Sequence, residues 1–210
     1  MKHHTKRKPH RFRELRRQPT PGSSPGVLQE VPDALTTKVT LFAYSPTECI
    51  EKTLDNFSTL NHYLAHYPVT WVHIAGFKDI HLIEEIGTLL NLHNLSLEDA
   101  INAHHRSKVE AYAHYIFIIA QMVHMGEKLH TEQISMFLLG NCLVTFQESH
   151  EDCLEPVRIR MKKSAGRIRT KGVDYLAYAV LDTIIDNYYP ALEQFNDMIC
   201  LLYTSDAADE

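Results

Sequence analysis

The sequence of 210 residues has few of the residues that mark disulfide-rich, collagenous or disordered proteins. It contains four Cys, eight Gly and nine Pro, too few for a collagen-like repeat or a broadly disordered chain. The cysteines lie far apart without a C-x-x-C pair, so we interpret them as reduced thiols rather than disulfides or a zinc site. With 44% hydrophobic and 22% charged residues, most of the chain should fold around one large core.

Long hydrophobic runs and catalytic motifs are also lacking. The longest apolar stretch, 134–146, is interrupted by Gly140-Asn141 and is shorter than the roughly 20 residues of a membrane-spanning helix. There is no G-x-S-x-G turn and no phosphate-binding Gly loop. We therefore expect no transmembrane segment in this chain and no enzyme.

Charge is distributed unevenly along the chain. The formal net charge is -5, but residues 1–17 carry eight Lys or Arg and one Glu, a local +7, which leaves -12 for the rest. An acidic body favours cations over nucleic acid. Residues 1–26 are predicted to be a basic disordered tail and linker. Contact of the tail with phosphates of nucleic acid or of an anionic membrane is an alternative, but a solvated tail is preferred and no nucleic-acid partner is expected.

Hydrophobic periodicity predicts strands that alternate with helices in the first half of the chain. The expected strands are 39–44 and 69–74, and the expected helices are 46–64 and 79–91. Ser96 is expected to cap a short helix over 97–102. Glu98 and Asp99 would then lie in its first turn, where the helix dipole favours acidic side chains.

The second half adds antiparallel pairing to this α/β pattern. A buried strand is expected within 109–125, and the segments 133–139 and 142–147 flank Gly140-Asn141 as a hairpin. A basic helix over 156–163 and a long helix from Val173 should follow. The apolar stripe of the long helix consists of Val173, Leu176, Val180, Ile184, Tyr188, Leu192 and Phe195. Pro190 lies inside that helix and should kink it near 186–189.

Seven short motifs follow one another between residues 69 and 199. They are Trp71-Val-His-Ile-Ala-Gly76, Leu97-Glu-Asp-Ala-Ile-Asn102, HHRSKV at 104–109, Glu132-Gln-Ile-Ser135, Phe146-Gln-Glu148, Pro156-Val-Arg158 and DYLAYAVLD at 174–182. In this order they resemble the cytoplasmic N-terminal domain of CorA-type magnesium and cobalt transporters. The resemblance implies an α/β/α layered domain with a mixed sheet over 27–172, followed by the start of a long C-terminal stalk helix over 173–199.

The resemblance also implies a function. In the family, divalent cations held between neighbouring cytoplasmic domains of a homopentamer act as a sensor that keeps the pore closed. The matching acids here are Asp99, with Glu98 beside it, and Asp182 in the long helix. The implied ions are regulatory Mg²⁺ between subunits, and also Co²⁺ or Zn²⁺. From the residues alone, helix N-terminal charge is the alternative role for Glu98 and Asp99, and an ion pair with Arg or Lys is the alternative for Asp182.

The family builds its pore from two C-terminal transmembrane helices with a Gly-Met-Asn signature, which this sequence lacks. The implied location is the cytoplasmic side of the inner membrane, with the missing helices anchoring the full-length protein. Residues 200–210 resemble the translation of a transposase sequencing adapter, so we interpret them as an artefact. On this interpretation the chain is a truncated, soluble fragment that does not conduct ions by itself.

The 14 histidines allow a second interpretation. His62 and His66 lie four residues apart on a predicted helix, a spacing that chelates zinc when a third ligand is in register. For this pair, and for His104-His105, His124 and His130, structural or surface roles are preferred. The zinc transporters of the ZntB type share the implied fold, so they remain an alternative family. A free-standing soluble metal-binding domain is the other alternative.

Overall fold

The computed structural model describes residues 25–29, 34–102, 105–124 and 129–206. Of the predicted tail and linker, only Pro25 and Gly26 belong to these ranges. His104 and residues 207–210 also lie outside them. The extent of the tail and the origin of the final residues therefore stay predictions.

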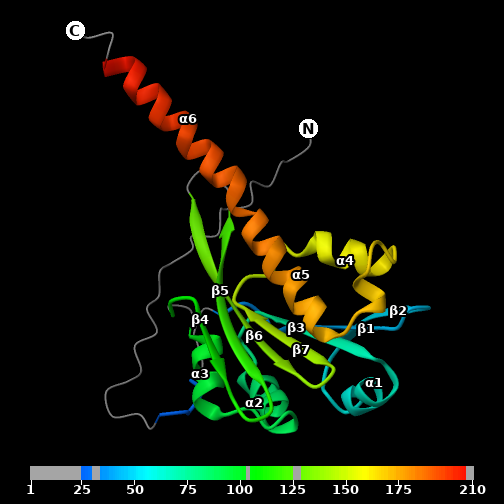
Figure 1. Ribbon diagram of the computed structural model, residues 1–210. Coiled ribbons are helices and arrows are strands. Elements are labelled where there is room, and N and C mark those ends of the chain that lie inside the picture. The colour runs from blue at the N-terminus through cyan, green and yellow to red at the C-terminus, as the bar shows by residue number, and fades with distance from the viewer. Residues whose placement is uncertain (1–24, 30–33, 103–104, 125–128, 207–210) are drawn as a thin grey trace, which may run out of the picture.

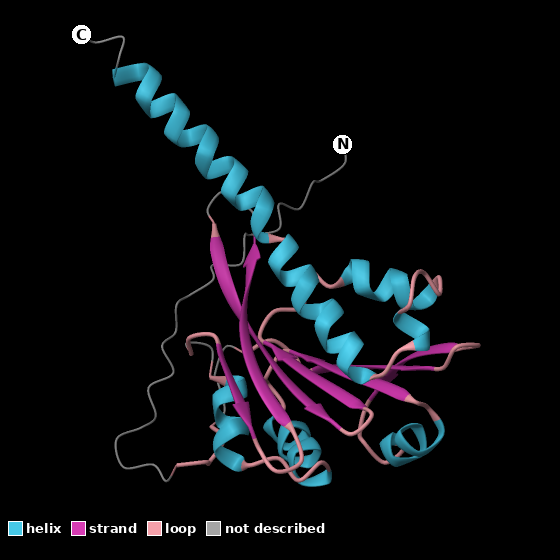
Figure 2. Ribbon diagram, in the orientation of Figure 1, coloured by secondary structure: helices cyan, strands magenta, loops and turns pink. Residues whose placement is uncertain are grey.

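Seven strands of the described part form one sheet in the order β2-β1-β3-β7-β6-β5-β4 (Figure 2). The strands are β1 (Lys38–Tyr44), β2 (Cys49–Leu54), β3 (Val69–Ala75), β4 (Lys108–Ala111), β5 (Ile116–His124), β6 (His130–Leu139) and β7 (Cys142–Gln147). The central pair β3 and β7 is parallel, and every other neighbouring pair is antiparallel. The sheet is therefore mixed, as the sequence and the resemblance predict.

Helices cover both faces of this sheet (Figure 1). One face carries α1 (Leu60–His66), α2 (Ile80–Leu89) and α3 (Asn94–Ile101), and the other carries α4 (Glu155–Lys162), the short 3₁₀ helix η1 (Ile168–Thr170) and α5 (Val173–Asp186). Two separate hydrophobic clusters lie between the sheet and these helices. Neighbouring residues of a strand point to opposite faces, so Trp71 packs with α5 whereas Val72 packs with α2. The α/β/α layered arrangement is confirmed.

The hairpin between β6 and β7 forms at the predicted place. Leu139 and Cys142 are paired across the turn, and Gly140 has a φ of +52°. Glycine adopts this left-handed conformation without the steric cost that a side chain would add. The turn thus fixes the register of the two strands beneath α3 and α5.

The predicted helix over 46–64 is wrong for most of its length. Residues 49–54 form β2, which pairs antiparallel with β1, and only α1 at the end of the range is helical. The apolar residues Ile50 and Leu54 are four apart, a spacing that shares one face in a helix and also in a strand. Pairing with the exposed edge of β1 decides between the two.

The long C-terminal helix breaks where Pro190 predicts a kink. The helix α5 ends at Asp186, and α6 (Tyr188–Asp206) starts after Asn187 and projects away from the sheet (Figure 1). Proline has no amide hydrogen to donate to the carbonyl four residues earlier, which here belongs to Asp186. Two side-chain donors hold the break against β5: Asn187 Nδ2 donates to the Val123 carbonyl, and the Tyr188 hydroxyl donates to the Gln121 carbonyl over 2.9 Å.

Candidate functional site

Asp99 lies near the end of α3 rather than in its first turn. The helix begins at Asn94, because the His93 side chain accepts the Leu95 amide hydrogen over 3.2 Å and caps it. Ser96, the expected cap, lies inside the helix and donates to the Tyr112 hydroxyl. The predicted start of the helix is therefore wrong. The alternative role of Glu98 and Asp99 as charges in the first turn of the helix is therefore wrong as well, because neither residue lies in that turn.

Two basic side chains hold the Asp99 carboxylate. Lys108 Nζ lies 2.7 Å from one oxygen and His105 Nε2 lies 3.2 Å from the other. Lys108 also contacts Glu110 over 2.8 Å. The side chains of Asp99 and Lys108 are 29% and 28% exposed, so water reaches the group. Asp99 thus sits in an ion-paired but accessible cluster of α3, β4 and the loop between them.

Electrostatics tie the members of this cluster together. Burial alone would lower the pKa of Lys108, but its hydrogen bonds to Asp99 and Glu110 outweigh burial and raise that pKa above the ordinary value. The hydrogen bond from Lys108 lowers the pKa of Glu110. Opposite charges at hydrogen-bond distance favour the charged form of each group. The ammonium therefore acts as a built-in counterion for two carboxylates.

Glu98, next to Asp99, has a different partner. Its Oε2 accepts the Gly26 amide hydrogen over 2.7 Å, and Leu28 packs against the hydrophobic cluster on the same face. Glu98 therefore ties the segment 25–29 onto α3. Glu98 and Asp99 are neighbours in the sequence, but their carboxylates have different hydrogen-bond partners.

Asp182 lies on the opposite face of the sheet from Asp99. The buried residues of α3, such as Leu97, belong to one hydrophobic cluster, and those of α5, such as Val180, belong to the other. Asp182 is half-buried and accepts a hydrogen bond from Tyr178 over 3.2 Å. The charge of Asp182 raises the pKa of that tyrosine. Among the described residues Asp182 has no ion pair with Arg or Lys, so that alternative is not what the structure shows.

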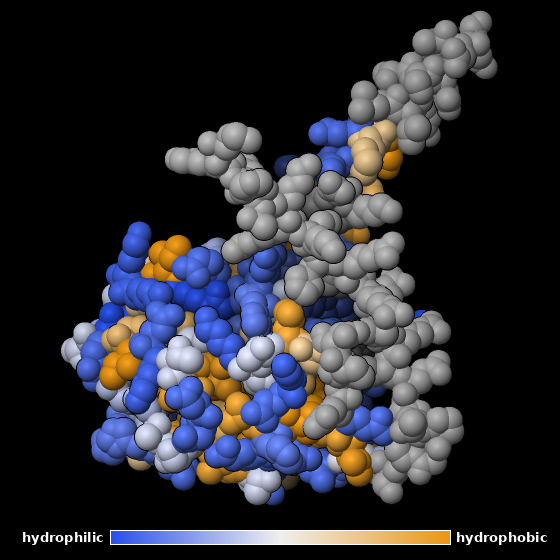
Figure 3. Space-filling view, turned by 180° about the vertical axis from the view of Figure 1, so that it is seen from behind, coloured by the Kyte–Doolittle hydropathy of each residue, from blue (hydrophilic) through white to orange (hydrophobic). Residues whose placement is uncertain are grey.

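The surface of α5 and α6 carries an exposed apolar seam. Its members are Tyr178, Ile185, Tyr189, Leu192, Phe195 and Ile199, which are 57%, 60%, 62%, 58%, 43% and 51% exposed. Apolar surface is visible on the described part of the projecting helix (Figure 3). The first two members are seven residues apart and the following gaps are four, three, three and four residues, a spacing found in helices that pack on other helices. The predicted stripe faces the core as far as Tyr188, which packs against the cluster under α5, and Leu192 and Phe195 are exposed.

The histidine pair at i, i+4 forms on α1. The rings of His62 and His66 are 4.1 Å apart, and His66 Nδ1 lies 2.7 Å from the His62 carbonyl oxygen. His124 Nε2 lies 3.0 Å from Glu132 Oε2. The His124 ring stacks on the His130 ring, with the ring centroids 5.1 Å apart. Across the described ranges, no group of three or more His, Cys, Asp or Glu side chains is placed to hold one metal ion.

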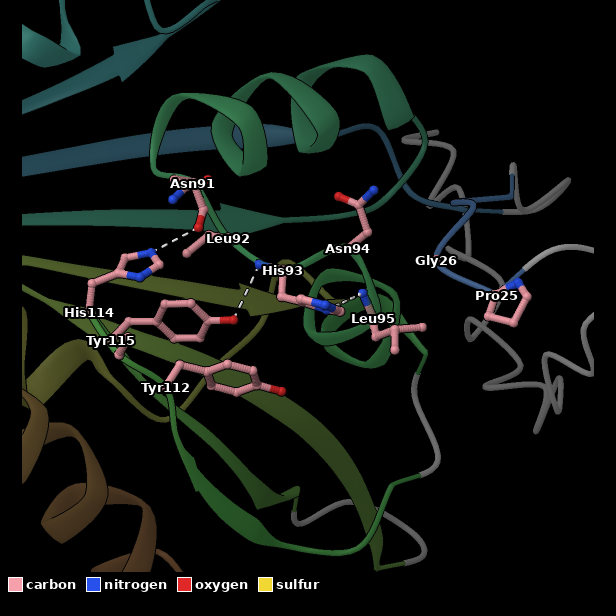
Figure 4. Close-up of a pocket in the computed structure, with 11 residues that line it drawn as sticks. Pro25, Gly26, Asn91, Leu92, His93, Asn94, Leu95, Tyr112, His114 and Tyr115 are labelled. Carbon is pink, nitrogen blue, oxygen red and sulfur yellow. Dashed lines mark hydrogen bonds between the residues drawn. The ribbon is translucent and has the colours of Figure 1, made fainter.

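A groove of about 650 Å³ opens beside the N-terminal end of α3 (Figure 4). Tyr112 and Tyr115 stack along it with ring centroids 4.5 Å apart, and the Tyr115 hydroxyl accepts the His93 amide hydrogen. Apart from two histidines, its lining has no charged side chain. The groove has the size of a small-molecule site, but its lining does not match the oxygen ligands of a magnesium ion.

Polar residues of the sheet that position Asp99 give no signal in the sequence. Gln133 Nε2 donates to the Asp99 carbonyl over 2.9 Å. Lys108 and Gln133 both fall inside the quoted motifs, but nothing in their spacing indicates a contact with Asp99. Such contacts arise only when the register of β4, β5 and β6 is known.

Known proteins resemble this chain in sequence. The sequence profile described as CorA-like Mg2+ transporter protein matches residues 68–202. The cobalt/magnesium transport protein CorA of Thermotoga maritima is 38% identical over 136 residues, which are 63% of this chain and 39% of that protein. The chain thus spans about two fifths of the length of this relative.

Solved structures share the fold. The soluble domain of CorA from Methanocaldococcus jannaschii superposes with a TM-score of 0.57 at 17% identity, covering 81% of this chain and 64% of that one. The ZntB cytoplasmic domain from Vibrio parahaemolyticus gives a TM-score of 0.54 at 10% identity, covering 78% and 64%. In the described part of this chain, no helix is both long and apolar enough to cross a membrane. Because the profile covers more than half of the sequence, the chain belongs to the family of CorA-like Mg²⁺ transporter proteins.

Proposed function

We propose that this chain is the cation-sensing and gating domain of a CorA-type divalent metal ion transport protein that carries Mg²⁺ or Co²⁺. The full-length protein would lie in the inner membrane with this domain on its cytoplasmic side, and the chain would be a truncated part of it. The observation that carries the proposal is Asp99, an accessible carboxylate whose partners are two side chains rather than buried backbone. The relatives named above are transport proteins, which supports a role other than catalysis.

The placement of the two acids favours a site between subunits. Asp99 and Asp182 lie on opposite faces of the sheet, so one protomer does not bring them to the same ion. In a ring of protomers, Asp99 and Asp182 would each share a cation with a carboxylate of a neighbouring protomer. Mg²⁺ prefers oxygen ligands and keeps several of its waters, so one or two carboxylates from each subunit suffice.

Such a site would work as a switch. Two carboxylates about 4 Å apart repel each other by about 4 kcal/mol at an effective dielectric constant near 20. Loss of the shared cation would therefore push neighbouring domains apart. A ligand that binds one arrangement better than another shifts the equilibrium between them, and the projecting α6 would carry that shift towards the pore.

The exposed seam on α5 and α6 supports assembly of several copies. Tyr178 and Ile185 flank Asp182 on α5, and both are more than half exposed. Apolar surface with helical spacing is stabilised by packing on another helix. We propose that it packs against the same helices of other copies in a homopentamer.

The test is magnesium-dependent association of the whole chain. Light scattering after size-exclusion chromatography, with and without MgCl₂, should show larger assemblies in Mg²⁺. Asp99→Ala and Asp182→Ala should each weaken this response, whereas Asp186→Ala, an exposed acid on the same helix as Asp182, should leave it unchanged. Equal responses in all three variants would reject the assignment of these acids.

The zinc alternative is tested in the same assay. A transporter domain of the ZntB type would respond to ZnCl₂ at lower concentration than to MgCl₂, and a free-standing metal-binding domain would respond without Asp182. Genomic DNA beyond Ile199 separates these cases further. A CorA-type gene encodes more stalk and two apolar segments of about 20 residues there.

A further inference from the structure

Gln133 links the Asp99 helix to the sheet. This glutamine of β6 is 4% exposed. Its Nε2 donates to the Asp99 carbonyl and its Oε1 accepts the His105 amide hydrogen over 3.0 Å. The same side chain therefore contacts both α3 and the backbone of His105. His105 is one of the two basic residues that contact the Asp99 carboxylate.

Gln121 extends this link to the next strand. It lies directly opposite Gln133 in the register of β5 and β6, so the two side chains share the face that α3 covers. Gln121 Nε2 donates to the His105 carbonyl over 2.9 Å. The peptide groups of His105 are thus held at both ends by a pair of neighbouring glutamines.

The backbone of Gln121 reaches the C-terminal helices. In the register of β4 with β5, Lys108 at the start of β4 pairs with Ile119, so β5 continues beyond its neighbour and exposes the edge of residues 120–124. The carbonyl oxygens of Gln121 and Val123 accept the donors of Tyr188 and Asn187. The break between α5 and α6 is therefore fastened to the strand that also carries the Gln121 side chain.

We propose that Gln133 and Gln121 are positioning residues that couple the state of Asp99 to the orientation of α6 within one protomer. The route runs from the Asp99 carbonyl to Gln133, His105, Gln121 and the Tyr188 hydroxyl. The coupling rests on the proposed function for its purpose, because it gives a cation at Asp99 a path to the projecting helix. The geometry itself requires no cation.

The physical basis is that these contacts are hydrogen bonds, which weaken steeply when the distance or angle changes. A buried amide that loses one partner is left unsatisfied, which is costly. When the ion pairs of Asp99 change and the His105 loop shifts, both glutamines must follow to keep their partners. Because β5 is paired along β6 over its whole length, the shift reaches the carbonyl groups that hold Asn187 and Tyr188.

A double-mutant cycle on the 210-residue chain tests the coupling. Amide hydrogen exchange of residues 187–199 is measured in the parent, in Asp99→Ala, in Tyr188→Phe and in the double variant, without added metal. Coupled sites typically change each other about fivefold or more. We expect Asp99→Ala to change the exchange rate by about this factor in the parent. The effect should be clearly smaller when the Tyr188 hydroxyl is absent, because only the Asn187 anchor then remains.

Gln133→Met gives a second cycle, since it keeps the volume of the side chain but removes its hydrogen bonds to Asp99, His105 and Ser135. Gln147→Met is its matched control: Gln147 is also a buried glutamine, but it donates to the Ser149 and Glu151 carbonyls. The control should preserve the effect of Asp99→Ala on α6, and Gln133→Met should abolish it. If Gln133→Met does not fold, the milder Tyr188→Phe cycle still decides the question.

Additive effects would overturn the coupling. If Asp99→Ala alters exchange of 187–199 equally in all backgrounds, or not at all in the parent, the glutamines only stabilise the fold. A parallel measurement with MgCl₂ on residues 94–102 separates this from the proposed function. Unchanged exchange there would reject cation sensing, whereas the cycles without metal judge the coupling alone.

Discussion

Asp99 and Asp152 are both acids with two basic partners, but they lie in very different surroundings. The Asp152 side chain is 4% exposed, makes an ion pair with Arg158 and lies 3.5 Å from His73 Nε2. The guanidinium of Arg158 in turn lies over the Trp71 ring. The Asp99 carboxylate, on the other face of the sheet, is 29% exposed. The first acid is part of the core beneath α4, and the second borders solvent.

This difference decides which acid is free to change partners. A buried charge that loses its partner stays uncompensated, which costs far more than the pair contributes over an apolar replacement. At an accessible site, water takes over from a lost partner and the net cost is small. Asp152 therefore keeps Arg158 as its partner and serves the stability of the fold. Under the proposed function, Asp99 would exchange Lys108 or His105 for a cation.

The largest expected effect comes from the buried acid. Asp152→Ala should lower the free energy of unfolding by about 3–5 kcal/mol, because Arg158 is left without its carboxylate in the core. Asp99→Ala should cost about 1 kcal/mol or less. Urea unfolding followed by circular dichroism measures both variants. Similar losses for the two would remove the distinction drawn between them.

The second largest effect is expected from lowering the pH, which should destabilise the buried cluster of His73, Asp152 and Arg158. Burial lowers the pKa of His73 to about 4, against the opposing charge of Asp152. An unfolded histidine has a pKa near 6.5, so between these values the unfolded chain binds more protons than the folded one. Stability is therefore present above about pH 6.5 and is lost as pH falls towards 4.

For His73 alone, the loss between pH 7 and pH 5 amounts to about 2 kcal/mol. Urea unfolding at both pH values measures it. His73→Gln, which does not titrate, should show a smaller difference between the two pH values than the parent. An equal pH dependence in parent and variant would mean that other groups cause the acid sensitivity.

The smallest effect is expected for the accessible pair. Lys108→Met keeps an unbranched apolar stem near Phe117 but removes the ammonium, so the unfolding free energy should fall by about 1 kcal/mol or less. Added NaCl should reduce the difference between parent and variant, because salt screens exposed charges. A loss that exceeds that of Asp152→Ala, or one that salt leaves unaffected, would contradict the assignment of this pair as exchangeable.

The sequence predicts the parts of the fold that local pattern determines. The strands around Val72 and Phe42, the turn at Gly140 and the break near Pro190 follow from alternation, turn chemistry and the missing amide of proline. The segment 46–64 is misjudged because its spacing fits a strand and a helix equally well. The motif order indicates the layered architecture, which periodicity alone leaves open.

The candidate site is predicted less completely. Asp99 and Asp182 emerge from motif order, and the start of α3 is misplaced because His93 is not an obvious capping residue. The partners of Asp99 come from segments whose distance in space depends on strand register. Gln133, which is 34 residues away in sequence, has no local signal that connects it with Asp99.

The interruption at Asn187 has a mechanical consequence for whatever lies beyond α6. Without the hydrogen bond that Pro190 omits, the angle between the two helices depends on a few side-chain anchors, so the joint acts as a pivot. The helical residues 188–199 make a lever about 18 Å long, and a swing of about 10° at its base moves the tip by about 3 Å. A small rotation at Asn187 would thus produce a larger displacement at the C-terminal end of α6.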